Sequence, residues 1–125
     1  LEALAIQRFD EAEALYRESL EDDLRVLGPD HDFTLQTQAN LSVLLRQANR
    51  LAEASELQEP VVAAMRRLHG PSDLRTLEAE RKLAICYTDL GRLDEAEALL
   101  RRCYAGMLER RGPEDVQTLD TMSAL

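Results

Sequence analysis

The segment DEAEAL at residues 10–15 returns letter for letter at residues 94–99, and AEASEL at residues 52–57 lies midway between them. The step is 42 residues each time. The same step separates three Gly-Pro pairs and three Thr-Leu pairs, which are Gly28-Pro29, Gly70-Pro71 and Gly112-Pro113, and Thr34-Leu35, Thr76-Leu77 and Thr118-Leu119. A fixed period of roughly 20 to 50 residues is typical of proteins built from stacked repeats. The period therefore predicts an extended surface for binding rather than an enclosed catalytic pocket.

Each period predicts two helices and a turn. In the middle period, apolar residues follow helical spacing over residues 35–48 and again over residues 51–68, and no segment alternates convincingly as a strand would. We call the first helix of each period a first-type helix and the second a second-type helix. Gly91 follows the first-type helix of the next period, where a left-handed helix end favours glycine, and Asn49 and Gln7 hold the equivalent positions. Each Gly-Pro pair should end a second-type helix, because proline cannot extend it. The sequence predicts an all-α fold.

Charged residues and one proline add local expectations. Asp32, Asp73 and Asp115 precede the first-type helices, where a carboxylate can cap free amides. The second-type helices close with arginines that complement the helix dipole, at Arg25, Arg66-Arg67 and Arg110-Arg111. Pro60 falls inside a second-type helix, so that helix is either kinked on its outer face or split in two.

Composition narrows the classes of function. The 125 residues are 45% apolar, which is typical of a folded protein. Their net charge of −9 disfavours binding to nucleic acid and to anionic membrane surfaces. No apolar run approaches the roughly 18 residues of a membrane span, and no secretory signal is visible, so we expect a cytoplasmic protein. Cys86 and Cys103 lack metal-ligand spacing, which favours buried free thiols.

The alanine within DEAEAL and the two-helix unit resemble the tetratricopeptide repeat, and the turn at residues 27–35 with Asn40-Leu41 resembles the 42-residue repeats of kinesin light chains. The resemblance implies a right-handed α-solenoid of stacked antiparallel helix pairs, in one domain over residues 1–125. By the period, residues 29–70 and 71–112 are repeats, while residues 1–28 and 113–125 are partial ones. We expect an excerpt of a longer array whose apolar end faces favour self-association.

In tetratricopeptide arrays the first-type helices line a concave groove, and this implies a peptide-binding surface here. Transferred position by position, the groove residues are Gln36, Asn40, Val43 and Gln47 in one helix, and Glu78, Arg81, Lys82, Ile85 and Asp89 in the next, with Asp120 opening a third stripe. Asparagine and glutamine can bond a peptide backbone, and Arg81 and Lys82 can pair with a carboxylate. Alternatively, Glu78 and Lys82 simply pair with each other within the helix.

No catalytic geometry or cofactor motif emerges. His31 and His69 map to turns between helices, where a turn hydrogen bond and a helix-terminal carbonyl are the expected partners. We therefore expect no enzyme activity, no cofactor and no metal. The favoured function is an interaction module for a protein or peptide partner. A structural spacer or oligomerisation array, and the sensor segment of a nucleotide-dependent switch protein, stay open as alternatives.

Overall fold

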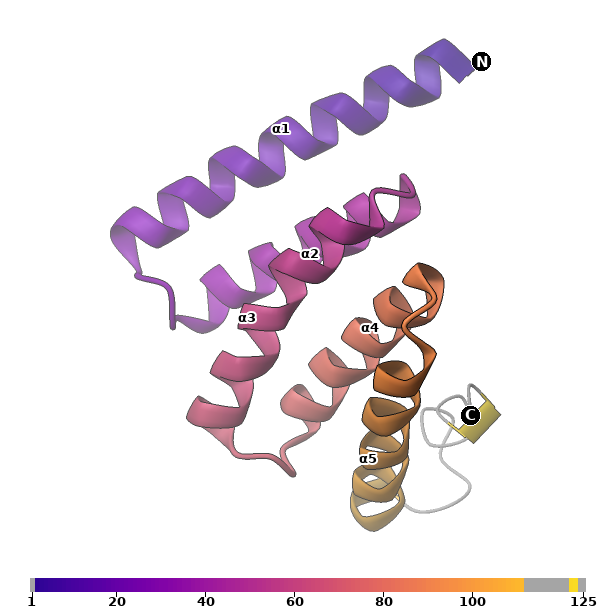
Figure 1. Ribbon diagram of the computed structural model, residues 1–125. Coiled ribbons are helices and arrows are strands. Elements are labelled where there is room, and N and C mark those ends of the chain that lie inside the picture. The colour runs from indigo at the N-terminus through magenta and orange to yellow at the C-terminus, as the bar shows by residue number, and fades with distance from the viewer. Residues whose placement is uncertain (1, 112–121, 124–125) are drawn as a thin grey trace. The chain divides into compact units, whose positions relative to one another are not determined.

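The computed structural model describes residues 2–111 and 122–123, and these residues form helices joined by short turns, without any strand. The expected all-α class is confirmed for this part of the chain (Figure 1). The helices are α1 (Glu2–Val26), α2 (Asp32–Gln47), α3 (Leu51–His69), α4 (Leu74–Leu90) and α5 (Leu93–Arg111). The turn residues Gly112-Pro113 and the expected positions Asp115, Thr118 and Asp120 lie outside the described residues.

The helices form two compact units, residues 1–61 and residues 62–125, and α3 contributes its first part to one and its second part to the other. These units are defined by contacts, whereas the 42-residue repeats are defined by sequence equivalence. The repeat boundaries therefore stay a prediction.

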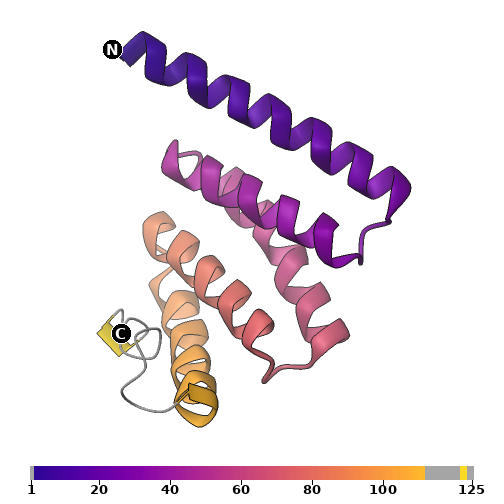
Figure 2. The ribbon, with the colours of Figure 1, turned by 180° about the vertical axis from the view of Figure 1, so that it is seen from behind.

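In the first unit, α1 lies along α2, as Figures 1 and 2 show from opposite sides. Thr37 of α2 donates its hydroxyl to the Asp23 carboxylate of α1 at 2.8 Å. Between α2 and α3, Ser42 Oγ donates to the backbone carbonyl of Ala54 at 2.8 Å. Ala54 is fully buried, and its single methyl group leaves room for this approach. The repeated alanine therefore marks a helix-crossing point.

The second unit also has a close side-chain-to-carbonyl contact between its helices, at a different level of the pair and from the second helix to the first. Helices α4 and α5 run antiparallel side by side (Figure 1), and Cys103 Sγ of α5 lies 3.4 Å from the Leu77 carbonyl of α4. A Cβ atom placed on Gly106 would be 2.7 Å from Leu77 Cδ1, so the side chain of Leu77 occupies the room that glycine leaves and would have to shift if this residue were larger. Ala96, the third copy of the repeated alanine, is 2% exposed.

The turns end the helices where the period places its glycines. Gly91 ends α4 with φ 83°, and Asn49 takes the same left-handed conformation after α2 with φ 63°. Gly28 and Gly70 have φ values of 86° and 89° beyond α1 and α3. Buried Thr76 then secures the turn between α3 and α4, because its hydroxyl contacts the Gly70 and Met65 carbonyls at 2.7 and 3.0 Å. These observations confirm the expected helix ends at Asn49, Gly70 and Gly91.

Two local expectations are wrong. Gln7 does not end a helix, because α1 continues unbroken from Glu2 to Val26. Glutamine favours the helix interior more than glycine or asparagine does, and the Gln7 side chain bonds Glu11 one turn later at 3.3 Å. Asp32 does not cap α2 either, since His31 takes that role by accepting the Phe33 amide on Nδ1 at 3.1 Å. The expectation that His31 makes a turn hydrogen bond is confirmed.

Asp73 and Pro60 settle two further expectations. Asp73 caps α4 as predicted, accepting the Arg75 amide at 2.8 Å. Pro60 is exposed within α3, which runs continuously from Leu51 to His69, so the alternative of a split helix is wrong. Because proline has no N–H, the carbonyl four residues before it lacks a backbone donor. On the exposed side of the helix, water can bond that carbonyl, and this limits the free-energy cost of the proline.

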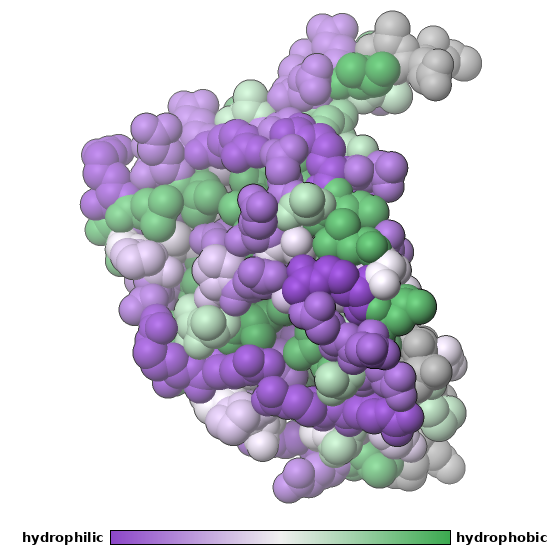
Figure 3. Space-filling model, in the orientation of Figure 1, coloured by the Kyte–Doolittle hydropathy of each residue, from purple (hydrophilic) through white to green (hydrophobic). Residues whose placement is uncertain are grey.

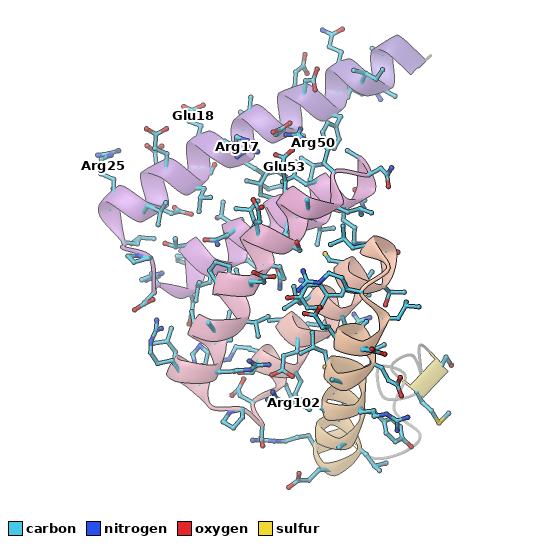
Figure 4. All side chains as sticks on the ribbon, viewed as in Figure 1. Arg17, Glu18, Arg25, Arg50, Glu53 and Arg102 are labelled. Carbon is cyan, nitrogen blue, oxygen red and sulfur yellow. The ribbon has the colours of Figure 1, made fainter. Side chains whose placement is uncertain are left out.

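Charged side chains join α1 to the start of α3. Arg50 Nη1 donates to Glu13 Oε1 at 2.6 Å, while the Arg50 guanidinium also bonds Glu53 at 2.8 Å (Figure 4). Arg17 of α1 binds the other Glu13 oxygen at 2.9 Å. The hydrogen bonds from Arg50, and then those from Arg17, lower the pKa of Glu13 below its ordinary value of 4.5. The ionised form of Glu13 is therefore the one that the folded unit stabilises.

We expect Glu13→Gln to lower the free energy of unfolding at neutral pH. A group with a lowered folded-state pKa stabilises the fold above its unfolded pKa, and that contribution is lost as the pH falls through the folded-state value. The difference between Glu13→Gln and wild type should therefore shrink as the pH drops below 4.5, the ordinary value. Urea unfolding at several pH values measures this difference. Glu21→Gln, at an exposed position of the same helix, is the control. A difference that does not depend on pH would contradict the stabilising role of ionised Glu13.

Candidate functional site

The expected stripe on α2 consists of four residues spaced by 4, 3 and 4 positions, which places them on one helix face. Gln36 and Gln47 are exposed, while Asn40 and Val43 are half-buried. Gln36 Nε2 donates to Asn40 Oδ1 at 3.0 Å, so the two amides are aligned along the helix. This bond leaves the Asn40 amide nitrogen and the Gln36 amide oxygen as groups that can bond a peptide backbone.

The expected stripe on α4 combines charged side chains with one apolar residue. Glu78 pairs with Arg81 at 2.7 Å. In the described part of the chain, half-buried Lys82 has no carboxylate partner, so the alternative of a Glu78–Lys82 pair is wrong. Arg81, one turn beyond Glu78, donates from Nη2 to Glu78 Oε1, while Glu78 Oε2 is buried without a hydrogen-bond partner. Ile85 is half-buried and Asp89 is exposed at the end of the same helix.

Each stripe is a property of its own helix. Helix α2 belongs to the first unit and α4 to the second, so a groove lined by both stripes stays a prediction. The chemistry of each stripe is nevertheless defined. The α2 stripe offers neutral donors and acceptors, and the α4 stripe offers an ammonium group without a carboxylate partner among the described residues.

Glu80 is a residue that the sequence analysis missed. Its side chain has no exposed surface, and Oε1 accepts from Arg66 Nε of α3 at 2.9 Å and from Arg102 Nη2 of α5 at 3.1 Å. One carboxylate of α4 thus holds an arginine from each neighbouring helix of the second unit. Arg66 was expected only to complement a helix end. A carboxylate taken out of water is costly unless it is paired, and two arginines meet that need here.

A signal for Glu80 exists in the sequence. It stands among the positions of α4 that are buried, three residues after Leu77 and three before Leu83. A charged residue within an apolar stripe is uncommon and requires a partner. The period does not reveal that partner, because the equivalent position in α2 is Gln38, which instead donates to the Leu57 carbonyl at 2.8 Å. The role of Glu80 therefore depends on tertiary packing.

Cys103 lies beside this cluster. Its Sγ atom is 3.9 Å from Glu80 Oε2, and burial, reinforced by the Glu80 charge, raises the pKa of the thiol to about 12. A thiol with such a high pKa remains protonated at neutral pH and is a poor nucleophile. Cys86 is also a buried free thiol, so both cysteines match the expectation of structural thiols.

The described residues contain no group of three or more His, Cys, Asp or Glu side chains suited to hold a metal ion. In the same part of the chain, no helix is both long enough and apolar enough to traverse a bilayer. The ionisable clusters that are present, around Glu13 and around Glu80, connect helices to one another. Their geometry is that of structural ion pairs.

Comparison with known proteins agrees with this description. A model of the family described as tetratricopeptide repeat matches residues 3–66 and 50–109. No relative was found among curated proteins. The chain is similar to solved TPR-like repeats assigned to a kinesin light chain of Podosopora anserina, with a TM-score of 0.90 and 24% identity over 97% of this chain. A second crystal structure, of a single-residue variant of those repeats, matches equally well.

The chain is also similar to BtubC (BKLC) from P. vanneervenii, with a TM-score of 0.81 and 20% identity over 94% of this chain. It spans 57% of the length of the first solved chain and 48% of the length of BtubC. At these identities the likeness concerns the fold, and it confirms the expected all-α solenoid.

We expect Glu80→Gln to lower the free energy of unfolding by about 2 kcal/mol, because hydrogen bonds to charged groups contribute about 1.5 to 3 kcal/mol. Glu97→Gln is the matched control, since Glu97 pairs with Arg101 on the surface at 2.7 Å, with both side chains more than half exposed. That control should change stability by less than about 0.5 kcal/mol. Chemical denaturation followed by circular dichroism measures both. Equal effects of the two substitutions would contradict the inference that the buried ion pairs of Glu80 with Arg66 and Arg102 stabilise the second unit.

Proposed function

The chain belongs to the tetratricopeptide repeat family, and from this premise we propose that it is an interaction module whose helices α2 and α4 bind a peptide segment of a partner protein. Tetratricopeptide repeats generally mediate protein–protein interaction, and families of this kind are non-enzymatic scaffolds. The proposal of a peptide ligand rests on polar groups that both stripes leave available. These are the amides of Gln36 and Asn40 on α2 and the ammonium group of Lys82 on α4.

The α4 stripe supports a partner with an acidic residue. Lys82 has no carboxylate partner among the described residues and lies one helical turn from Ile85, which is half-buried. A carboxylate of the peptide would find the ammonium group unoccupied, while an apolar side chain would cover Ile85. Charge-assisted hydrogen bonds of this type are roughly twice as strong as neutral ones.

The α2 stripe supports recognition of the peptide backbone. Asn40 and Gln36 are already aligned by their mutual hydrogen bond, so fewer rotamers are lost when a peptide binds. Val43 supplies the apolar contact in this stripe, as Ile85 does in α4. We infer that the ligand is a short peptide carrying one acidic side chain and at least one apolar side chain. We propose that the whole protein binds partners that carry such a peptide.

We expect Asn40→Ala combined with Lys82→Ala to weaken the tightest peptides from a displayed peptide library by about tenfold or more, since two polar contacts of about 1 kcal/mol each are removed. Fluorescence anisotropy measures the affinity. Arg101→Ala is the control, because it also removes one positive charge, from the exposed surface of α5.

Lys82 is the only lysine in the chain, so amine-selective labelling reports on it directly. The bound peptide should protect Lys82 from labelling. Full reactivity in the saturated complex, or unchanged affinity of the double variant, would refute the assignment of these stripes. A spacer or oligomerisation array would then be the better account.

A further inference from the structure

Three exposed apolar side chains, which we call the turn patch, lie at the turn between α1 and α2. They are Val26 and Phe33, each 68% exposed, and Leu27. The two helices leave the turn in opposite directions (Figure 1), and Thr37 of α2 bonds Asp23 of α1 at 2.8 Å. Val26 and Leu27 come one helical turn after Asp23, and Phe33 comes one helical turn before Thr37, so the three lie at one level. Figure 3 shows hydrophobic surface beside hydrophilic surface at this end of α1.

The exposed ring of Phe33 is held in place by His31. The centroids of the two rings are 5.3 Å apart, and the ring planes meet at 34°. His31 is itself fixed, because its Nδ1 atom accepts the amide hydrogen of Phe33 and so caps α2. An aromatic ring that is already ordered loses little side-chain entropy when a ligand covers it. Phe33 is therefore arranged as a contact residue for a partner.

The equivalent turn between α3 and α4 has the same backbone but different side chains. The glycine after the preceding helix has a φ of 86° in the first turn and 89° in the second. One period beyond Val26 and Phe33 lie Leu68 and Arg75, of which Leu68 is 42% exposed and Arg75 more than half exposed. Exposure is thus a property of these positions in both turns. Because the second turn forms with an arginine in place of Phe33, the fold does not require an exposed aromatic ring there.

Acidic residues surround the turn patch. Residues 21–33 contain one arginine and five acidic residues, which are Glu21, Asp22, Asp23, Asp30 and Asp32. The equivalent residues 63–75 contain three arginines and one acidic residue, and no acidic residue occupies any of the five equivalent positions. Asp22 lies one helical turn before Val26 and bonds Arg25 at 3.1 Å, in an exposed pair that solvent weakens. The first turn therefore combines apolar contact area with negative charge, and the fold requires neither.

We propose that the turn patch is a docking site for a basic segment of a partner protein. An aromatic or aliphatic side chain of that segment covers Val26 and Phe33, and its basic residues lie beside Glu21 and Asp22. Complementary charge of this kind selects the partner and speeds its association. The site goes beyond the proposed function, because it uses neither Asn40 nor Lys82 and takes a ligand of the opposite charge.

The same charges disfavour other occupants. Nucleic acid and anionic membrane surfaces would be repelled by the five acidic residues. Two copies of the chain that met symmetrically through this turn would also bring acidic residues together. The arginine-rich turn of a second copy is a poor occupant, because Arg66 and Arg75 already bind Glu80 and Asp73, at 2.9 and 3.1 Å.

The test uses two variants whose new side chains are those of the equivalent turn. Phe33→Arg introduces the residue found at position 75, and Glu21→Ala plus Asp22→Ala introduces the residues found at positions 63 and 64. Since the second turn forms with these side chains, both variants should fold, and circular dichroism verifies this. The matched controls lie on exposed positions of α5 and make the same kinds of change. They are Leu93→Arg, and Asp94→Ala plus Glu109→Ala.

The probes are peptides from a displayed library that bind the whole chain, after those that also bind the Phe33→Arg variant have been removed. They should carry several basic residues and at least one aromatic or aliphatic residue. In fluorescence anisotropy, Phe33→Arg should weaken the tightest peptides at least about tenfold, because an aromatic contact is lost and a repulsion is added. Glu21→Ala plus Asp22→Ala should weaken them about threefold or more at low salt. Each control should change the affinity less than about twofold.

The opposite results overturn the proposal. They are the absence of any peptide after the removal step, peptides that are neutral or acidic, and controls that weaken binding as much as the turn variants do. The variant Asn40→Ala plus Lys82→Ala should bind these peptides as wild type does, and a loss of binding there would assign them to the stripes instead. If sedimentation shows self-association that Phe33→Arg abolishes while no peptide depends on Phe33, the turn is an interface between copies.

Discussion

The structure depends on the close contact between the two helices of a pair, which a small residue of the second helix makes possible. Ala54 lets Ser42 reach its backbone carbonyl, and Cys103 contacts the Leu77 carbonyl beside Gly106. A larger side chain at these crossing points would separate the helices and leave the polar groups of the contact without partners. The spacing of the repeated alanines, Ala12, Ala54 and Ala96, is therefore the spacing of the helix pairs.

The sequence predicted the helices and most of their ends because those features depend on local chemistry. Glycine and asparagine tolerate the left-handed conformation found at Gly91 and Asn49, and proline after Gly70 prevents α3 from continuing. The predictions failed where neighbouring residues compete for one role. His31 capped α2 ahead of Asp32, and Gln7 favoured helix continuation over the turn that its position in the period predicted.

The candidate site was less accessible to sequence reasoning. The stripe residues of α2 and α4 follow from helical spacing, but their partners do not, and Glu78 pairs with Arg81 rather than with Lys82. Glu80 was missed because its significance depends on Arg66 and Arg102, which come from two other helices. Sequence spacing determines which residues share a face, whereas burial and long-range pairing determine what they contact.

The most direct test of the close helix contact is the stability of Ala96→Leu compared with Ala98→Leu. Ala96 is buried on α5 at the position equivalent to Ala54, while Ala98 is exposed on the same helix. Overpacking a close-packed contact costs about 1 to 3 kcal/mol, so Ala96→Leu should lower the free energy of unfolding by about 2 kcal/mol in urea titrations, and Ala98→Leu should leave it nearly unchanged. Equal stability of the two variants would contradict the account.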